Sequence, residues 1–124
     1  MLEREKVLIL GGGFAGVKAA LELCQDKRFE VTLLSDDDEL RYYPTLYRSA
    51  TGGKRSNSSI PLAEIFDDKR ITIAQGTATK LIRKDKTVTT SNGRAYEYNT
   101  LIIALGVVTN YFGIKGLKDY SYSI

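Results

Sequence analysis

A glycine-rich turn directly after an apolar run constrains this chain more than any other stretch. The run from Val7 to Leu10 predicts a buried parallel strand, and residues 14–26 have the apolar period of a helix. Between them, Gly11, Gly13 and Gly16 stand at the spacing G-x-G-x-x-G. At such a junction the three glycines make the tight turn, let the backbone approach a pyrophosphate, and let the helix pack closely on the strand. The junction therefore predicts dinucleotide binding, with the helix N-terminus facing the phosphates.

A second strand is expected from Glu30 to Ser35, which completes a βαβ unit of the usual length, about 30 residues. In such a unit an acidic residue about 20 positions beyond the last glycine accepts hydrogen bonds from the ribose of the ligand. Asp36 stands at that spacing from Gly16, and its neighbour Ser35 is the other candidate for this contact. An acid there favours an NAD- or FAD-type adenosine over NADP, because it repels a 2′-phosphate. The acidic residues that follow are interpreted as a solvated turn.

Residues 40–59 are expected to form a long connector rather than the next repeat of a plain Rossmann fold. The stretch from Arg41 to Tyr47 is aromatic without a helical period, and Pro44 biases Tyr43 away from helix. The tyrosines either pack on the surface or line a flat ring beyond the carboxyl edge of the strands. The sequence leaves both interpretations open. After the connector, Pro61 suits the first position of a helix.

Three short strands in the second half of the chain are predicted to form an antiparallel meander. They span Gly76–Arg83, Lys86–Ser91 and Arg94–Asn99. Asn92-Gly93 is a strong two-residue hairpin signal between the last two. Strands are also expected over Arg70–Ala74 and Leu101–Gly106, the latter buried and parallel, and the tail from Val107 is expected to be a loop. The predicted fold class is α/β: a Rossmann-like domain with a central parallel sheet and an antiparallel three-stranded β-meander.

Composition excludes several kinds of site. The chain has no histidine, which excludes a histidine metal site and a Ser-His triad, and we expect no metal. Its one cysteine, Cys24, excludes an internal disulfide and a Cys-x-x-Cys pair. Cys24 falls on one helical face with Phe14, Val17 and Leu21, and is interpreted as an inert core thiol.

Charge and hydropathy limit the kinds of partner and the location that the sequence favours. A net charge of +3, with an acidic block from Asp36 to Glu39, does not favour nucleic acid as a partner. No apolar stretch approaches the roughly 18 residues that a membrane span needs. The first residues also lack the apolar core of a signal peptide. A cytoplasmic location is therefore expected.

Three stretches together resemble a known family. They are Val7–Gly16, Tyr43–Gly52 and Asn110–Gly113. With the meander and the strand that ends in Ala104-Leu105-Gly106, the chain resembles the FAD-binding half-domain of flavoproteins that carry two dinucleotide-binding domains. More closely, it resembles the N-terminal part of type II NADH dehydrogenases, which are NADH:quinone oxidoreductases.

The resemblance implies a set of FAD contacts. The residues that match the family pattern are Gly11, Gly13, Phe14, Ala15, Gly16, Ser35, Asp36, Pro44, Thr45, Ala78, Ala104 and Gly106. By this resemblance the glycine turn holds the FAD pyrophosphate, and Ala78 meets the adenine through its backbone. Ser35 occupies the position of the family's ribose-binding acid, while Asp36 falls one residue later. Pro44 and Thr45 match the connector that runs near the flavin.

The resemblance also implies an activity. Hydride passes from NADH to the flavin, and the electrons pass on to a quinone. No residue here is a candidate acid, base or nucleophile, so no catalytic residue is named. The family's enzymes are much longer, and residues 1–124 are expected to be a partial FAD/NAD(P)-binding domain, the N-terminal fragment of a longer protein.

Further expectations follow from the fragment interpretation. The chain alone is expected to have little or no turnover and to self-associate through the face that truncation leaves open. The full-length family lies on the cytoplasmic face of the membrane, which it reaches through segments that are not present here.

Three alternatives stay open. The first is the FAD domain of a sulfide:quinone reductase, an enzyme that needs cysteines beside the flavin. The second is a stand-alone NAD-binding Rossmann module without redox activity. The third is a purely structural α/β domain with a vestigial glycine turn.

Overall fold

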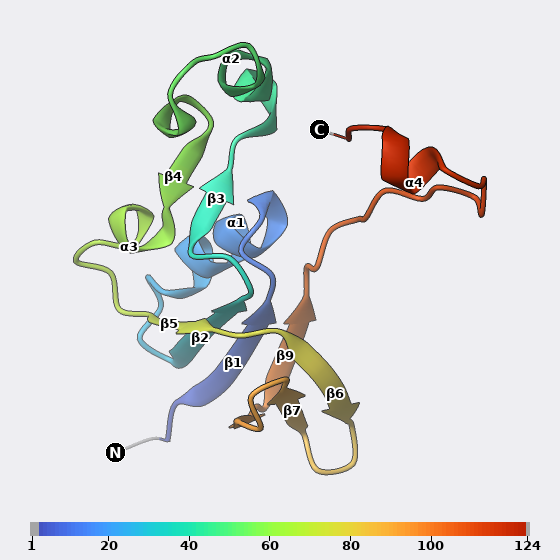
Figure 1. Cartoon of the computed structure of the whole chain (residues 1–124). Helices are drawn as coiled ribbons and strands as arrows, with labels where there is room; N and C mark the ends of the chain where they lie inside the picture. The colour runs from blue at the N-terminus through green and yellow to red at the C-terminus, as the bar shows by residue number, and fades with distance from the viewer. Residues whose placement is uncertain (1–2, 124) are drawn as a thin grey trace.

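The chain folds around a four-stranded parallel sheet with strand order β5-β2-β1-β9 (Figure 1). The computed structural model describes residues 3–123. The strands of this sheet are β1 (Glu5–Leu10), β2 (Phe29–Ser35), β5 (Thr72–Gln75) and β9 (Thr100–Ile103). Val7 to Leu10 of β1 are all at most 4% exposed. Such a continuous apolar run is what a central parallel strand requires, because both of its faces are covered.

Different elements cover the two faces of the sheet. On one face, α1 (Phe14–Leu23) and α3 (Leu62–Ile65) complete a core that includes Val7, Ile9, Val31 and Leu33. On the other face lies the antiparallel meander of β6 (Ala78–Ile82), β7 (Thr87–Thr90) and β8 (Ala95–Glu97). Its Val88 packs with Leu8, Leu10 and Leu34 in a second core cluster. Alternate residues of β1 therefore point into two different cores.

A small two-stranded layer extends from the sheet beside α1 (Figure 1). It pairs β3 (Glu39–Arg41) with β4 (Ser59–Pro61) in antiparallel register. Between them the chain forms three short helices: η1 (Tyr43–Thr45), α2 (Leu46–Ala50) and η2 (Arg55–Asn57). We call this layer with its short helices the β3–β4 extension. It occupies the place where the sequence predicted a connector.

The tail stands away from the sheet and carries the short helix α4 (Leu117–Tyr120) (Figure 1). The sequence predicted only a loop there, and that prediction was wrong over these four residues. Gly116 precedes α4 in a left-handed conformation (φ +81°). Among residues 3–123, no helix combines the length and the apolar character needed to cross a membrane.

The predicted fold class is confirmed, including the meander and the parallel pairing of β1, β2 and β9. Some helices and strands begin or end at other residues than the sequence predicted. Helix α1 ends at Leu23 rather than near residue 26. Pro61 is the last residue of β4 and caps α3 rather than opening it. The β3–β4 pair itself was missed, because each strand has three residues and its partner lies about 20 positions away along the chain.

Two burial predictions were also wrong. Phe14 is 48% exposed, because the first residue of α1 projects past the sheet edge, while Cys24 is buried at 4% as expected. Strand β9 is one of the two edge strands of the sheet and ends at Ile103, which is 60% exposed. The predicted buried strand therefore has only one strand neighbour among the described residues.

Candidate functional site

A groove of about 770 Å³ opens where the parallel strands end. Its walls come from the turns after β1, β2, β5 and β9. The lining residues are Gly11, Gly12, Gly13, Phe14, Ala15, Leu34, Ser35, Asp36, Asp37, Glu39, Arg41, Tyr43, Gly76, Thr77, Ala78, Ala104, Leu105, Gly106 and Val107. The chain runs from β1 toward β2 on one side, and β9 lies on the other, so the groove sits at a reversal of strand order. Open α/β sheets bind their ligands in such a crevice.

The three glycines of the G-x-G-x-x-G turn, Gly11, Gly13 and Gly16, differ in why the position requires glycine. Gly11 has φ +105°, and a Cβ on it would collide with the carbonyl oxygen of Ala104. A Cβ on Gly16 would collide with the carbonyl oxygen of Gly11, so this glycine lets α1 pack against the turn. Gly13 is unlike both, because a Cβ on it would have no protein atom within 4 Å. The fold does not need a glycine at that position, whereas a ligand that approaches the backbone closely does.

The N-terminus of α1 offers free backbone donors to the groove. The first bond of the helix runs from the Val17 amide to the carbonyl of Gly13, at 2.9 Å. The preceding amides of Phe14, Ala15 and Gly16 have no acceptor among the described residues, and no side chain caps the helix. Unpaired amides and the helix dipole together favour an anion at this end.

The opposite side of the groove is acidic. Ser35 is 3% exposed and lies beneath Gly12, where an added Cβ would be 2.6 Å from its Oγ. Asp36, the next residue, is exposed at the groove surface. Asp37 and Glu39 complete a carboxylate-lined wall. Carboxylates at a groove surface can accept hydrogen bonds from sugar hydroxyls, and the ribose contact stays a prediction.

Aromatic rings close the groove at the helix end. The ring of Phe14 lies 5.9 Å from the ring of Tyr42 and 6.4 Å from that of Tyr43. Tyr43 lines the groove, whereas Tyr42 and Tyr47 do not. Tyr43 therefore has the groove position that the ring-lining interpretation requires, whereas Tyr42 and Tyr47 lie on the surface outside the groove.

Most predicted contacts meet in this groove. Those that line it are Gly11, Gly13, Phe14, Ala15, Ser35, Asp36, Ala78, Ala104 and Gly106. Gly16 lies behind the turn, and Pro44 and Thr45 lie in η1, away from the lining. The hydroxyl of Thr45 donates to the carbonyl of Asn57 at 2.6 Å, so it stabilises the β3–β4 extension.

Other lining residues were missed by sequence reasoning. Gly76 and Thr77 follow the carboxyl end of β5, and the rule for parallel strand ends identifies them once β5 is known. Glu39, Arg41 and Tyr43 occur at alternate positions along β3 and the start of η1. That alternation is the sequence pattern of a strand with one face toward the groove, but it is short and is flanked by acidic and aromatic residues that do not alternate.

The fold and groove define a dinucleotide-binding domain of the FAD-dependent reductase class. A family model described as pyridine nucleotide-disulphide oxidoreductase matches residues 5–124, and the chain belongs to this family. Members of the family bind FAD and NAD(P)H generally.

Similar proteins agree with this placement. The chain is 32% identical to a type II NADH:quinone oxidoreductase of Staphylococcus aureus, over 98% of this chain and 31% of that protein. It superimposes on the sulfide:quinone oxidoreductase of Aquifex aeolicus with a TM-score of 0.85 and 28% identity, over 94% of this chain and 28% of that one. NDH2 of Plasmodium falciparum matches with a TM-score of 0.83 and 26% identity, over 97% and 26% of the two chains. The chain thus spans about a third of the length of the curated relatives it matches.

Proposed function

We propose that this chain is the FAD-binding portion of an NADH dehydrogenase-like flavoprotein, in which electrons pass from NADH through FAD to a quinone. The observation that carries the proposal is the open face of Gly13 at the uncapped N-terminus of α1. A backbone surface that is clear of protein atoms and rich in free amides suits a diphosphate. The 32% identity to an NADH:quinone oxidoreductase favours this flavoprotein over other members of the family.

The described residues fit the ADP half of FAD. The amides of Phe14 and Ala15 would hold the diphosphate, and Asp36 would accept hydrogen bonds from the ribose hydroxyls. Ala78 and Gly76, after β5, would flank the adenine. The bound flavin supplies the hydride and electron chemistry, and the protein supplies binding and orientation. No lining side chain is needed as an acid or base for this role.

The test is a titration of the purified chain with FAD, followed by flavin fluorescence. We expect FAD to bind and ADP to compete with it, because the retained contacts lie on the ADP half. NADH should be oxidised only slowly by the chain alone. Binding of NAD with no affinity for FAD or ADP would instead support the stand-alone module.

A sulfide:quinone reductase is the second candidate, because the Aquifex aeolicus enzyme matches this fold with a TM-score of 0.85. Cys24 does not favour it. Its thiol is buried at the C-cap of α1, donates to the carbonyl of Leu21 at 3.4 Å, and does not line the groove. Sulfide added anaerobically to the flavin of the longer protein that the proposal implies distinguishes the candidates: the flavin should stay oxidised if the proposal holds, and rapid bleaching by sulfide would contradict it.

A further inference from the structure

Arg41 is the only basic residue among those that line the groove in residues 3–123. The other charged lining residues are the carboxylates of Asp36, Asp37 and Glu39. A dinucleotide carries a negatively charged diphosphate, so this wall by itself repels part of its own ligand. The guanidinium of Arg41 is therefore the one lining side chain, among the described residues, that attracts the phosphates.

The backbone places Arg41 between the ribose side and the phosphate side. Glu39, Arg41 and Tyr43 line the groove at alternate positions, while the intervening Leu40 is buried in the core. Tyr43 contacts Phe14 at the N-terminus of α1, with 6.4 Å between ring centroids. Arg41 ends β3 and Tyr43 begins η1 two residues later, so their backbones are at most about 7 Å apart. An arginine side chain is about as long as that span, and Arg41 lines the same groove as Gly13, Phe14 and Ala15 at the helix N-terminus.

The guanidinium of Arg41 is weakly held. Its Nη2 lies 3.8 Å from Oδ2 of Asp37, with the side chain 54% exposed, and it makes no hydrogen bond to the described residues. Arg55 is a useful contrast. Its Nε donates to Oε2 of Glu39 at 3.1 Å, and its Nη2 lies 2.8 Å from the same oxygen. An exposed ion pair as long as that of Arg41 contributes little, so exchanging it for a charge-assisted bond to phosphate costs little.

We propose that Arg41 leaves Asp37 and binds the diphosphate of the dinucleotide, opposite the free amides of α1. This inference rests on the proposed function, because it requires a dinucleotide in the groove. It adds a specificity-determining side chain that the glycine turn does not supply. Adenosine alone lacks the phosphates and makes no use of Arg41.

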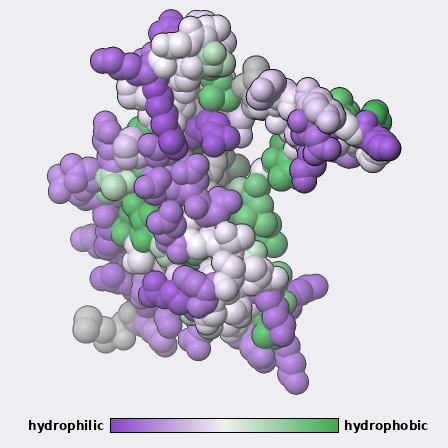
Figure 2. All heavy atoms as spheres, viewed as in Figure 1, coloured by the Kyte–Doolittle hydropathy of each residue, from purple (hydrophilic) through white to green (hydrophobic). Residues whose placement is uncertain are grey.

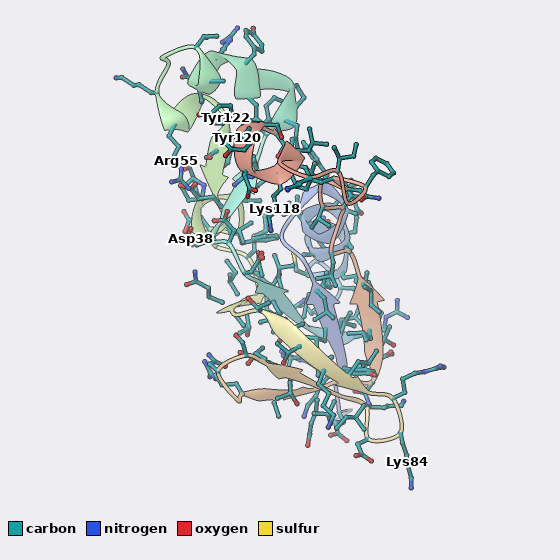
Figure 3. The ribbon with its side chains drawn as sticks, turned by 45° about the vertical axis from the view of Figure 1, so that its right-hand side comes forward. Asp38, Arg55, Lys84, Lys118, Tyr120 and Tyr122 are labelled. Carbon is teal, nitrogen blue, oxygen red and sulfur yellow. The ribbon has the colours of Figure 1, made fainter. Side chains whose placement is uncertain are left out.

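Other basic residues serve as controls. Figure 3 shows Arg55 on the β3–β4 extension and Lys84 at the far tip of the meander. Neither residue lines the groove. Lys84→Gln removes one positive charge far from the groove, whereas Arg55→Gln also leaves the lining carboxylate of Glu39 without its ion pair. Arg41→Gln removes the proposed phosphate contact.

The experiment measures binding of ADP, adenosine and 2′,5′-ADP to each variant by calorimetry. We expect Arg41→Gln to weaken ADP binding about tenfold or more, as for a charge-assisted contact, and to leave adenosine within about twofold. Lys84→Gln should bind ADP within about twofold of the wild type, and Arg55→Gln should weaken ADP binding less than Arg41→Gln does, because Arg55 acts only through Glu39. Asp37→Asn should tighten ADP binding, because it frees Arg41 and removes a carboxylate.

Each outcome has a definite meaning. Unchanged ADP binding by Arg41→Gln overturns the inference while the proposed function stands. An equal loss of adenosine and ADP assigns Arg41 to folding of the groove and also overturns it; thermal unfolding of each variant identifies that case independently. A loss confined to 2′,5′-ADP places Arg41 at a 2′-phosphate and overturns the diphosphate assignment. Failure of the wild type to bind ADP overturns both the inference and the proposed function.

Discussion

Replacing Gly13 with alanine separates the demands of the ligand from those of the fold. Gly13 has φ −82° and ψ −168°, an extended conformation that alanine adopts freely. A Cβ there has no protein atom within 4 Å. Alanine is a poorer N-cap than glycine, which destabilises the folded state by roughly 0.5–1 kcal/mol. Alanine also reduces the conformational entropy of the unfolded chain, which stabilises the folded state by a similar amount, about 0.4–1 kcal/mol. The free energy of unfolding of Gly13→Ala should therefore match that of the wild type to within about 1 kcal/mol.

Binding should respond very differently. The added methyl group occupies the space through which a diphosphate approaches the amides of α1. Overpacking of this size costs about 1–3 kcal/mol, which corresponds to a loss of affinity of roughly 5- to 150-fold. Calorimetric titration with ADP, together with denaturant unfolding of the free protein, measures both quantities on one sample.

The matched control is Gly16→Ala, three residues further along. Its Cβ would collide with the carbonyl oxygen of Gly11, which is backbone and cannot move aside cheaply. We expect this variant to lose about 1–3 kcal/mol of stability even without ligand. Tight ADP binding by Gly13→Ala would refute the assignment of the open face to a diphosphate. A Gly16→Ala protein as stable as the wild type would refute the steric reasoning itself.

Three further predictions concern stability, titration and association. Ile9 is fully buried at the centre of the sheet, so Ile9→Ala should lower the free energy of unfolding by about 2–5 kcal/mol in a denaturant titration, and a loss below that range would show a relaxed core. Hydrogen bonds from Arg28 lower the pKa of Asp26 from 3.8 to about 2, so the stability linked to this carboxylate is present above about pH 4 and lost as the pH falls toward 2. Arg28→Ala should return the pKa of Asp26 toward 3.8 in an NMR titration, and an unmoved pKa would contradict the assignment. Figure 2 shows apolar surface from the end of β9 into the tail, where Ile103 is 60% and Val107 97% exposed. Light scattering should therefore detect self-association of the chain, and the double variant Ile103→Lys with Val107→Ser should reduce it. Equal association of the wild type and the variant would place the contact elsewhere.

Local patterns in the sequence were sufficient for much of the fold. The apolar run of β1, the Asn92-Gly93 turn between β7 and β8, and the glycine spacing each involve residues within a few positions of one another. Backbone conformation and strand period depend mainly on such neighbours, so these elements could be predicted. The residues that follow parallel strands were also predictable as groove residues, because those strand ends must meet at one edge of the sheet.

Contacts between distant segments were decided only by the tertiary structure. The pairing of Arg41 with Ser59 brings together residues from opposite ends of the β3–β4 extension, and this pairing turns Arg41 toward the groove. Likewise, Phe14 belongs to an apolar helical face by its spacing, yet it lies beyond the sheet edge and contacts Tyr42 and Tyr43 instead. The sequence by itself thus determined the glycine turn between β1 and α1 and the strands that surround it. Which charged and aromatic side chains face that turn depends on long-range packing, because no local period records the position of a distant partner.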